Sequence, residues 1–431
     1  MRTCHRARLR DVAALLALCT ALACGDGGTV GPQGGVQFVA VRGADQTAPW
    51  GGLLPDSLVV QASTSKGPLV ENVTWNVISG GGRISAAPGA PAATGRSAAA
   101  WYLGPTPGVQ EAEARLSSGV TVRFRATGVA GTAPVFTAPL IPYQSIRDIS
   151  AMGNMNPPSH TIPSDHIYFY ITGPGCPCST PPATPVSAPA AGVVEEIIRG
   201  NGSTSDDQIF VRVAPHVVYY VLHVRLPAGI SVGQRITEGQ SLGVTSGLTL
   251  AVDLGVMNYQ RTPVRLIDPG RYADRAVYGD APLRFYTDSV RSRLYAKVAR
   301  TGADKDGRHD YDLPGRLLGG WFVEGTPRAE SANQWARQLQ FAYLAEDPAV
   351  PVVAIGGTVA TPGVYRLDGP DPAQITAGNG VVVYRLRTTR GAPWGSLVVQ
   401  VQAGERLRVQ AVPDNQTVTE FVAGTVTTYL R

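Results

Sequence analysis

Two imidazoles and a carboxylate fall within seven residues near the middle of this chain. The segment runs from His160 through Asp165 to His166, and Ile167-Tyr168-Phe169, which is typical of a β-strand, follows at once. Imidazole nitrogens and carboxylate oxygens are donors that zinc takes in proteins. The segment is therefore a candidate for part of a metal site that a strand holds in place.

Three further elements follow this segment in a characteristic order. They are Ala188-Pro189-Ala190-Ala191-Gly192-Val193-Val194, Tyr219-Tyr220-Val221-Leu222-His223 and Gly233-Gln234-Arg235-Ile236-Thr237-Glu238-Gly239-Gln240-Ser241-Leu242-Gly243. The order resembles that of the LytM-type M23 family of zinc metallopeptidases, whose β-rich core is a duplicated hybrid motif. The resemblance spans residues 160–256, less than a quarter of the 431-residue chain.

The resemblance implies a role for several of these residues. His160 and Asp165 match the first metal motif, and His223 matches the strand histidine that assists the reaction. A histidine from a closing His-x-His motif would complete the ligands and leave a fourth position on zinc for water. A hydrolytic zinc site has this general plan of three protein ligands and water.

The closing motif departs from the family pattern. Ala251 stands where its first histidine would be, and Asp253 stands where the ligand histidine would be. Aspartate also binds zinc, but two carboxylates and one imidazole make a more anionic site and a poorer Lewis acid. Nothing replaces the imidazole lost at Ala251. In addition, His160 and Asp165 enclose four residues where the family has three.

Three functions remain open at this point. In the first case the chain would be an active peptidoglycan endopeptidase that binds zinc through His160, Asp165 and Asp253, with His223 assisting the reaction. Alternatively, the fold is kept without catalysis and binds peptidoglycan or a cell-envelope protein, which is the function that the sequence alone favours. In the third case the cluster only organises a loop, and the protein is structural or adhesive. A second metal set, with His160, Asp165, His166 and His223, requires Asp165 and His166 to lie in a turn.

The first residues predict export. Arginines precede the short apolar run 12–22, which ends at Ala23-Cys24-Gly25. A basic start, a short apolar run and small residues are typical of a signal peptide. Cys24 at its end resembles the lipidated residue of a bacterial lipoprotein, so we expect a lipid anchor in a membrane and a location in the cell envelope or at the surface. Cys176 and Cys178 remain, and we expect a loop feature there.

Charge and motifs exclude several classes of function. Lys and Arg total 37 against 32 Asp and Glu, for a net charge of +5. No basic stripe with interleaved aromatics stands out, so no nucleic-acid partner is expected. Biotinyl and lipoyl carriers need an exposed lysine, and none lies between Gly67 and Lys297. No Gly-x-Ser-x-Gly elbow supports a serine nucleophile.

The rest of the chain predicts a mainly β protein, since 50 Gly and 34 Pro favour short strands joined by turns. Behind a signal peptide (1–23) and a tether (24–35) we expect a bacterial Ig-like β-sandwich with Trp75 in its core. A Pro-rich linker would then lead to the duplicated-hybrid-motif core. The expected units are 36–131 (sandwich), 132–149 (linker), 150–270 (M23-like core), 271–349 (helical extension) and 350–431 (β-rich module).

Two helices and an acidic turn complete the expectation. Apolar spacing predicts helices from Pro282 to Val298 and from Ser331 to Ala345. The segment 304–312 carries four aspartates but fails the EF-hand pattern at its first and last ligand positions. We expect a solvated acidic turn there.

Overall fold

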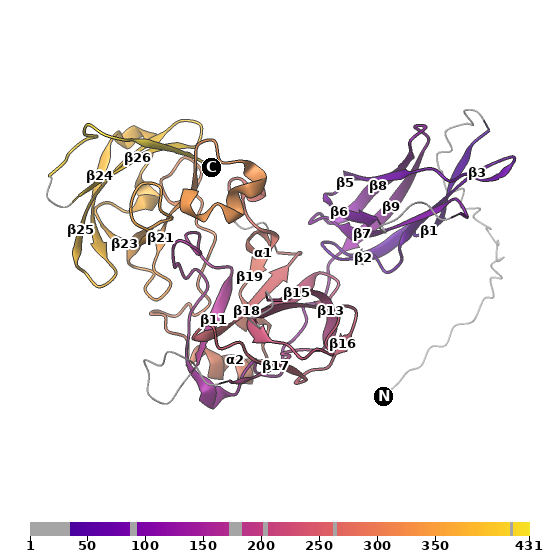
Figure 1. Ribbon diagram of the computed structural model, residues 1–431, viewed down its shortest axis with the longest axis horizontal. Coiled ribbons are helices and arrows are strands. Elements are labelled where there is room, and N and C mark those ends of the chain that lie inside the picture. Colours follow the sequence, from indigo (N-terminus) through magenta and orange to yellow (C-terminus); the bar gives the residue numbers. More distant parts are fainter. Residues whose placement is uncertain (1–34, 87–92, 172–182, 201–205, 262–264, 414–416) are drawn as a thin grey trace, which may run out of the picture.

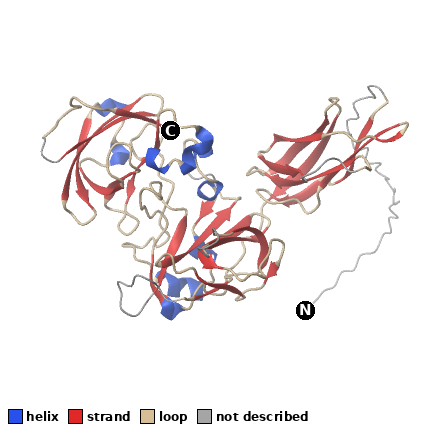
Figure 2. Ribbon diagram, in the orientation of Figure 1, coloured by secondary structure: helices blue, strands red, loops and turns tan. Residues whose placement is uncertain are grey.

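The chain folds into three β units that follow one another in sequence (Figure 1). The computed structural model describes residues 35–86, 93–171, 183–200, 206–261, 265–413 and 417–431. Strands dominate each unit, and the helices are short (Figure 2). The mainly β class expected from the sequence is confirmed.

The first unit is a sandwich of two sheets. One sheet has the order β1-β3-β7-β6 with β4 paired to β3, and the other has the order β2-β9-β8-β5. Its strands are β1 (Gln37–Arg42), β2 (Gln46–Pro49), β3 (Leu58–Thr64), β4 (Gly67–Pro68), β5 (Val73–Ser79), β6 (Gly82–Ala86), β7 (Arg96–Leu103), β8 (Gly108–Leu116) and β9 (Thr121–Val129).

The core tryptophan of this sandwich is Trp101 rather than Trp75. Trp75 lies on β5, an edge strand, and is only partly buried, with its ring centroid 5.8 Å from that of Phe124. Trp101 lies on β7 between two neighbouring strands and is fully buried. The expectation for Trp75 is wrong because the local sequence does not show which strand occupies the edge position of a sheet.

The second unit is a sheet in the order β10-β11-β18-β15-β14-β13-β16, with β12, β17 and β19 paired to its members. The strands are β10 (Ile146–Ile149), β11 (His166–Ile171), β12 (Pro185–Ser187), β13 (Gly192–Ile198), β14 (Asp207–Ala214), β15 (Val217–Arg225), β16 (Arg235–Ile236), β17 (Ser241–Thr245), β18 (Ala251–Asn258) and β19 (Gly279–Asp280).

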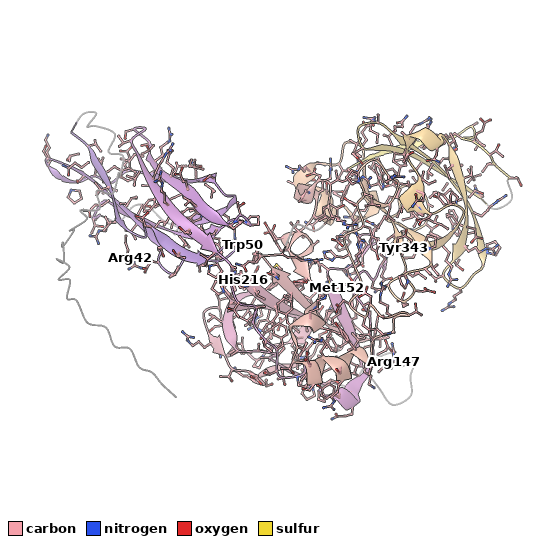
Figure 3. All side chains as sticks on the ribbon, turned by 180° about the vertical axis from the view of Figure 1, so that it is seen from behind. Arg42, Trp50, Arg147, Met152, His216 and Tyr343 are labelled. Atoms are coloured by element: carbon pink, nitrogen blue, oxygen red, sulfur yellow. The ribbon has the colours of Figure 1, made fainter. Side chains whose placement is uncertain are left out.

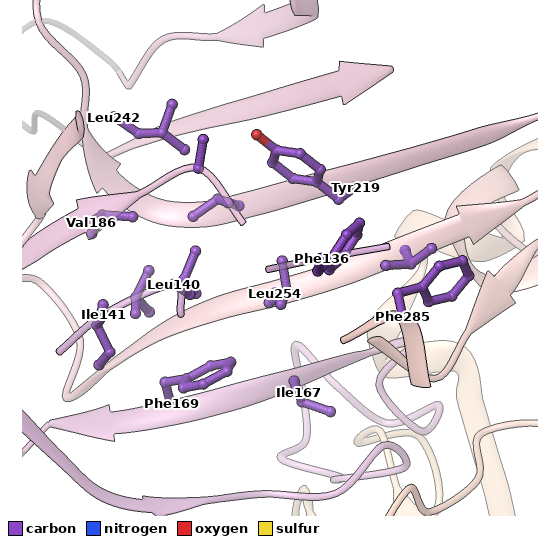
Figure 4. Close-up of a cluster of buried hydrophobic side chains, with 14 of the residues drawn as sticks. Phe136, Leu140, Ile141, Ile167, Phe169, Val186, Tyr219, Leu242, Leu254 and Phe285 are labelled. Atoms are coloured by element: carbon purple, nitrogen blue, oxygen red, sulfur yellow. The ribbon is translucent and has the colours of Figure 1, made fainter. Parts of the chain in front are cut away.

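The expected linker 132–149 is part of this central unit. Phe136, Leu140 and Ile141 are buried in one hydrophobic cluster with Phe169 and Leu254 from the sheet (Figure 4). The same segment ends in β10. Pro139 and Pro142 flank the buried Leu140 and Ile141, which hold this part of the segment against the sheet, whereas Pro134 precedes the buried part.

Helices are few and short in the described residues. They are α1 (Asp274–Val277), α2 (Asp288–Tyr295) and the 3-10 helices η1 (Tyr143–Ser145), η2 (Pro269–Arg271), η3 (Pro282–Phe285), η4 (Arg328–Asn333), η5 (Trp335–Arg337), η6 (Pro372–Gln374) and η7 (Ala377–Asn379). The predicted helix 282–298 is realised as η3 and α2. In the described ranges, no helix is long and apolar enough to cross a bilayer.

The third unit is a closed barrel that begins well before residue 350. Its strands, in order around the barrel, are β20 (Gly319–Val323), β21 (Gln338–Tyr343), β22 (Pro351–Ile355), β23 (Gly363–Asp368), β24 (Val382–Thr388), β25 (Pro393–Gln402), β26 (Arg406–Pro413) and β27 (Thr427–Leu430). The helix predicted over 331–345 is wrong, because β21 occupies its second half. Leu339 and Phe341 alternate into the barrel core, and pairing with β20 and β22 overrides the helical spacing.

Of the four aspartates in 304–312, Asp306, Asp310 and Asp312 are buried rather than solvated, whereas Asp304 is exposed. Asp306 accepts hydrogen bonds from Arg284 Nε at 2.6 Å and from Tyr295 Oη at 2.7 Å. Asp312 accepts from the backbone amides of Gly320 at 2.7 Å and Ile267 at 2.9 Å. Asp306 thus links this segment to η3 and α2, and Asp312 links it to β20 of the barrel.

The sandwich is also attached to the central sheet. Gln260 accepts from the Gly131 amide at 2.9 Å and donates to the Val129 carbonyl at 3.1 Å. A Cβ atom at Gly131 would fall 2.5 Å from His216 Cε1 and 2.9 Å from Pro49 Cβ, so His216 lies at this junction, where Figure 3 labels it.

Candidate functional site

The register of three central strands gathers polar side chains on one face of the sheet. His166 on β11 and Tyr220 on β15 both pair with Gly255 on β18. Tyr168 pairs with Asp253 in the next row. Alternate side chains point to opposite faces, and the intervening residues, Ile167, Leu254 and Val221, belong to the main hydrophobic core. The face opposite this core is the candidate site.

Asp253 is the centre of the site. Its side chain is 1% exposed, and its Oδ1 has no hydrogen-bond partner. Nε2 of His166 lies 3.5 Å from Asp253 Oδ2, and Nε2 of His223 lies 3.4 Å from the same oxygen. Burial raises the pKa of Asp253 to about 6, although the nearby His166 and His223 charges act to lower it. Two imidazoles therefore face one carboxylate oxygen.

Asp165 holds His166 through the ring nitrogen that faces away from Asp253. Its Nδ1 lies 2.6 Å from Asp165 Oδ1. Asp165 Oδ1 also accepts from Tyr220 Oη at 2.7 Å, and Arg275 Nε lies 3.5 Å from its other oxygen. Burial favours the neutral acid, but the His166 hydrogen bond and charge, and Arg275, hold the pKa of Asp165 well below its usual range. Both oxygens of Asp165 therefore contact these partners. His166, and not Asp165, faces Asp253.

His223 reaches the site through an unusual backbone conformation. In a regular strand it would point with Val221 into the core. However, β15 pairs with β18 up to Leu222 and with β17 from Val224, and His223 between them has a φ of 63°. This left-handed conformation accompanies the turn of the imidazole to the Asp253 face. The side chain is 28% exposed, so it is accessible to solvent.

Asp206 is a site residue that the sequence did not reveal. Its Oδ1 and Oδ2 lie 3.1 and 3.0 Å from Nδ1 of His223. Asp206 precedes β14, and no local pattern links it to a histidine seventeen residues later. Tyr220 and Arg275 were missed for the same reason, because only the fold brings them to Asp165.

His160 lies beside this cluster on the loop that precedes β11. Its ring centroid is 5.5 Å from that of His166 and 6.3 Å from that of Tyr168. Burial, and then the charge of His166, lower the pKa of His160 to about 4. The ring is therefore neutral at pH 7, with a lone pair available. The neighbouring Thr161 donates to the carbonyl of Trp335 at 3.4 Å, which holds the loop against the barrel segment.

The remaining candidate residues add no donor at this face. Ala251 pairs with Tyr170 at the start of β18 and offers only a methyl group where the resemblance implied an imidazole. Cys24, Cys176 and Cys178 lie outside the described residues. Their expected roles remain predictions.

The donors around Asp253 fit zinc in kind and in part of their spacing. With bonds of about 2.1 Å, two ligands of a tetrahedral zinc lie about 3.4 Å apart, and the His166 to Asp253 separation is 3.5 Å. Both His166 Nε2 and Asp253 Oδ1 are buried without partners. No group of three or more His, Cys, Asp or Glu side chains in the described ranges is already gathered to hold a metal ion. The structure thus provides a facing pair of donors, with further imidazoles adjacent.

Comparisons with known proteins place M23 peptidases among similar solved structures. No protein-family model matches the sequence, and no curated protein matches it. A putative peptidase M23 from Pseudomonas aeruginosa is 16% identical, covers 49% of this chain and 90% of its own, and has a TM-score of 0.19. A zinc-containing peptidase from Vibrio cholerae is 12% identical, with 49% and 56% covered and a TM-score of 0.23.

A third similar structure is cbpa from L. salivarius REN, at 25% identity over 19% of this chain and 50% of its own, with a TM-score of 0.15. The chain spans 50% and 56% of the lengths of the L. salivarius and Vibrio proteins.

Proposed function

We propose that the central unit is an M23-like, peptidase-type domain that hydrolyses peptide bonds in the cell envelope. The observation that carries this proposal is the convergence of Nε2 of His166 and Nε2 of His223 on one oxygen of Asp253. Two unpartnered buried atoms at the same place support it. A cluster of this kind, with a strained residue among its members, is more typical of a functional site than of a structural one.

The buried and the exposed side chains of the site are suited to different roles. When bound here, zinc would supply an activated water and polarise the substrate carbonyl. His166 and Asp253 are buried and suited to hold the metal, whereas His223 is solvent-accessible and suited to transfer a proton to the leaving amine. Asp206 holds the Nδ1 proton of His223 and so directs its Nε2 towards the site.

The substrate class follows from the expected location. A signal peptide over 1–23 with lipidation at Cys24 would place the protein in the cell envelope on a lipid anchor, with the sandwich between the anchor and the central unit. Peptide crosslinks in peptidoglycan are a peptide substrate available there. We therefore propose peptidoglycan as the substrate and the envelope as the site of action.

A second candidate is binding of cell-wall peptide without cleavage. Ala251 favours it, because its methyl group cannot supply the additional imidazole that the resemblance implied. In this case Asp253, His166 and His223 would bind the substrate's polar groups, with no reaction.

Digestion of purified peptidoglycan by the full chain with added zinc tests both candidates. New amino groups released by the natural chain and not by His223→Ala support hydrolysis. His216→Gln, which changes an imidazole at the sandwich junction, serves as the matched control and should digest normally. Co-sedimentation with peptidoglycan without release of amino groups supports the binding candidate. If the chain neither releases amino groups nor co-sediments with peptidoglycan, the proposal is overturned.

A further inference from the structure

The tautomers of the two central histidines follow from their carboxylate partners. An ionised carboxylate only accepts hydrogen bonds. Nδ1 of His166 faces Asp165, and Nδ1 of His223 faces Asp206. Both Nδ1 atoms therefore carry the proton, and in the neutral rings both Nε2 atoms present lone pairs.

These lone pairs point at another acceptor. Nε2 of His166 lies 3.5 Å from the Asp253 carboxylate and has no hydrogen-bond partner, although its side chain is only 1% exposed. Two acceptors that face each other in a buried place repel each other, and leaving a buried acceptor unpaired costs free energy. A cation between them removes both penalties. A histidine whose other nitrogen donates to a carboxylate is also the usual arrangement at protein zinc sites.

The sequence motif pointed to Asp165 as the ligand on this side of the site. Asp165 instead shares one oxygen between His166 and Tyr220, with Arg275 beside the other. Using it as a ligand would break these contacts. His160 offers the third donor. Two imidazoles on one tetrahedral zinc have ring centroids about 5 Å apart, and those of His160 and His166 are 5.5 Å apart.

We propose that His160, His166 and Asp253 are the metal ligands of this chain, and that Asp165 is a positioning residue that fixes the His166 ring. Relative to the set expected from the sequence, which was His160, Asp165 and Asp253, the imidazole of His166 on β11 takes the place of the Asp165 carboxylate, and Asp253 on β18 is retained. The assignment rests on the proposed function and specifies its metal site. Nε2 of His223 also lies 3.4 Å from Asp253 Oδ2, but its side chain is 28% exposed whereas that of His166 is 1% exposed, so we assign His223 to proton transfer and not to the ligand set.

Metal binding by the full chain, stripped with a chelator, tests this assignment without reference to activity. Cobalt titration followed by visible absorption, with metal analysis after dialysis against zinc, gives affinity and stoichiometry. The natural chain should bind one metal ion. His166→Ala and Asp253→Ala should weaken binding by more than about 100-fold. Asp165→Asn should weaken it about 10- to 100-fold, the usual effect of losing such a partner.

An exchange variant gives the sharpest comparison. His166→Asp and Asp253→His together keep one imidazole and one carboxylate on the two facing strands. The double variant should bind metal within about 10-fold of the natural chain, whereas each single change should not. His223→Ala should bind within about 3-fold and yet fail to digest peptidoglycan. Amide exchange of β18 shows in each case whether the variant has folded.

The outcomes separate this assignment from the proposed function. Full metal binding by His166→Ala, or loss in Asp165→Asn equal to that in Asp253→Ala, would overturn the ligand set while hydrolysis by the natural chain stood. Loss of metal in His223→Ala would also overturn it. A natural chain that neither binds metal nor digests peptidoglycan would remove the function and the assignment together.

Discussion

Gly255 lies directly beneath the ring of Tyr220, and a Cβ atom at position 255 would fall 2.0 Å from Tyr220 Cζ. The absence of a side chain lets the tyrosine cross the middle strand and donate to Asp165 at 2.7 Å. Gly255→Ala should therefore displace the ring and destabilise the central unit by about 1–3 kcal/mol, the usual cost of overpacking. Denaturant unfolding monitored by amide exchange of β18 measures the effect.

A second substitution isolates the cause. If the cost of Gly255→Ala arises from contact with Tyr220, it should largely disappear in a Tyr220→Ala background, because contacting residues are not additive. Equal costs of Gly255→Ala in both backgrounds would show that the strand tolerates no side chain at this position for another reason.

His160 and Asp253 give the metal-free protein two opposing pH dependences. Asp253 has its pKa raised from 3.8 to about 6, so the folded chain binds a proton that the unfolded chain has lost, and this contribution to stability falls as pH rises from about 4 to 6. His160 has its pKa lowered from 6.5 to about 4, so the unfolded chain binds the proton first, and this contribution rises with pH over about 4 to 6.5.

Substituting either residue should reveal the pH dependence of stability that the other contributes. Metal-free His160→Asn should become less stable from pH 4 to 6, and metal-free Asp253→Asn should become more stable over the same range. Each change should reach at most about 3 kcal/mol, and the natural chain should vary less than either variant. Amide exchange of β18 reports the stability of the unit. If stability changed with pH in the same direction in both variants, the two residues would not have opposing effects.

The sequence allowed prediction of the β class and of the segments that form the site, but not of all its members. His160, His223 and Asp253 do come together around His166. The choice of Asp165 followed motif spacing, although the alternation of His166, Tyr168 and Tyr170 along the strand already places His166 on the site face. Asp206 had no local signal, because only the pairing of β14 with β15 brings it to His223.

The same limit explains the errors elsewhere in the fold. Apolar residues from Ser331 to Ala345 have helical spacing, yet β21 pairs on both sides in the barrel. The aspartates of 304–312 have the composition of a surface turn, yet Arg284 and backbone amides hold Asp306 and Asp312 inside. In each case partners distant in sequence determined the outcome.

Trp101 and Trp75 should contribute unequally to the sandwich. Trp101→Ala removes a fully buried side chain and should destabilise this unit by about 3–5 kcal/mol. Trp75→Ala, on an edge strand and partly exposed, should cost less. Amide exchange of β3, which pairs with the Trp101 strand, measures both. A larger cost at Trp75 would restore it as the core tryptophan.

His223 should lower stability while serving the site. Its φ of 63° lies in the left-handed region, which costs a residue with a Cβ about 1–2 kcal/mol and glycine little. His223→Gly and His223→Ala both remove the contacts with Asp206 and Asp253, so the difference between them isolates the backbone. We expect His223→Gly to be about 1 kcal/mol more stable than His223→Ala, by amide exchange of β15, with hydrolysis lost in both. Equal stability would mean that the chain relaxes at this position once the imidazole is removed, and that the conformation is maintained by the contacts of the ring.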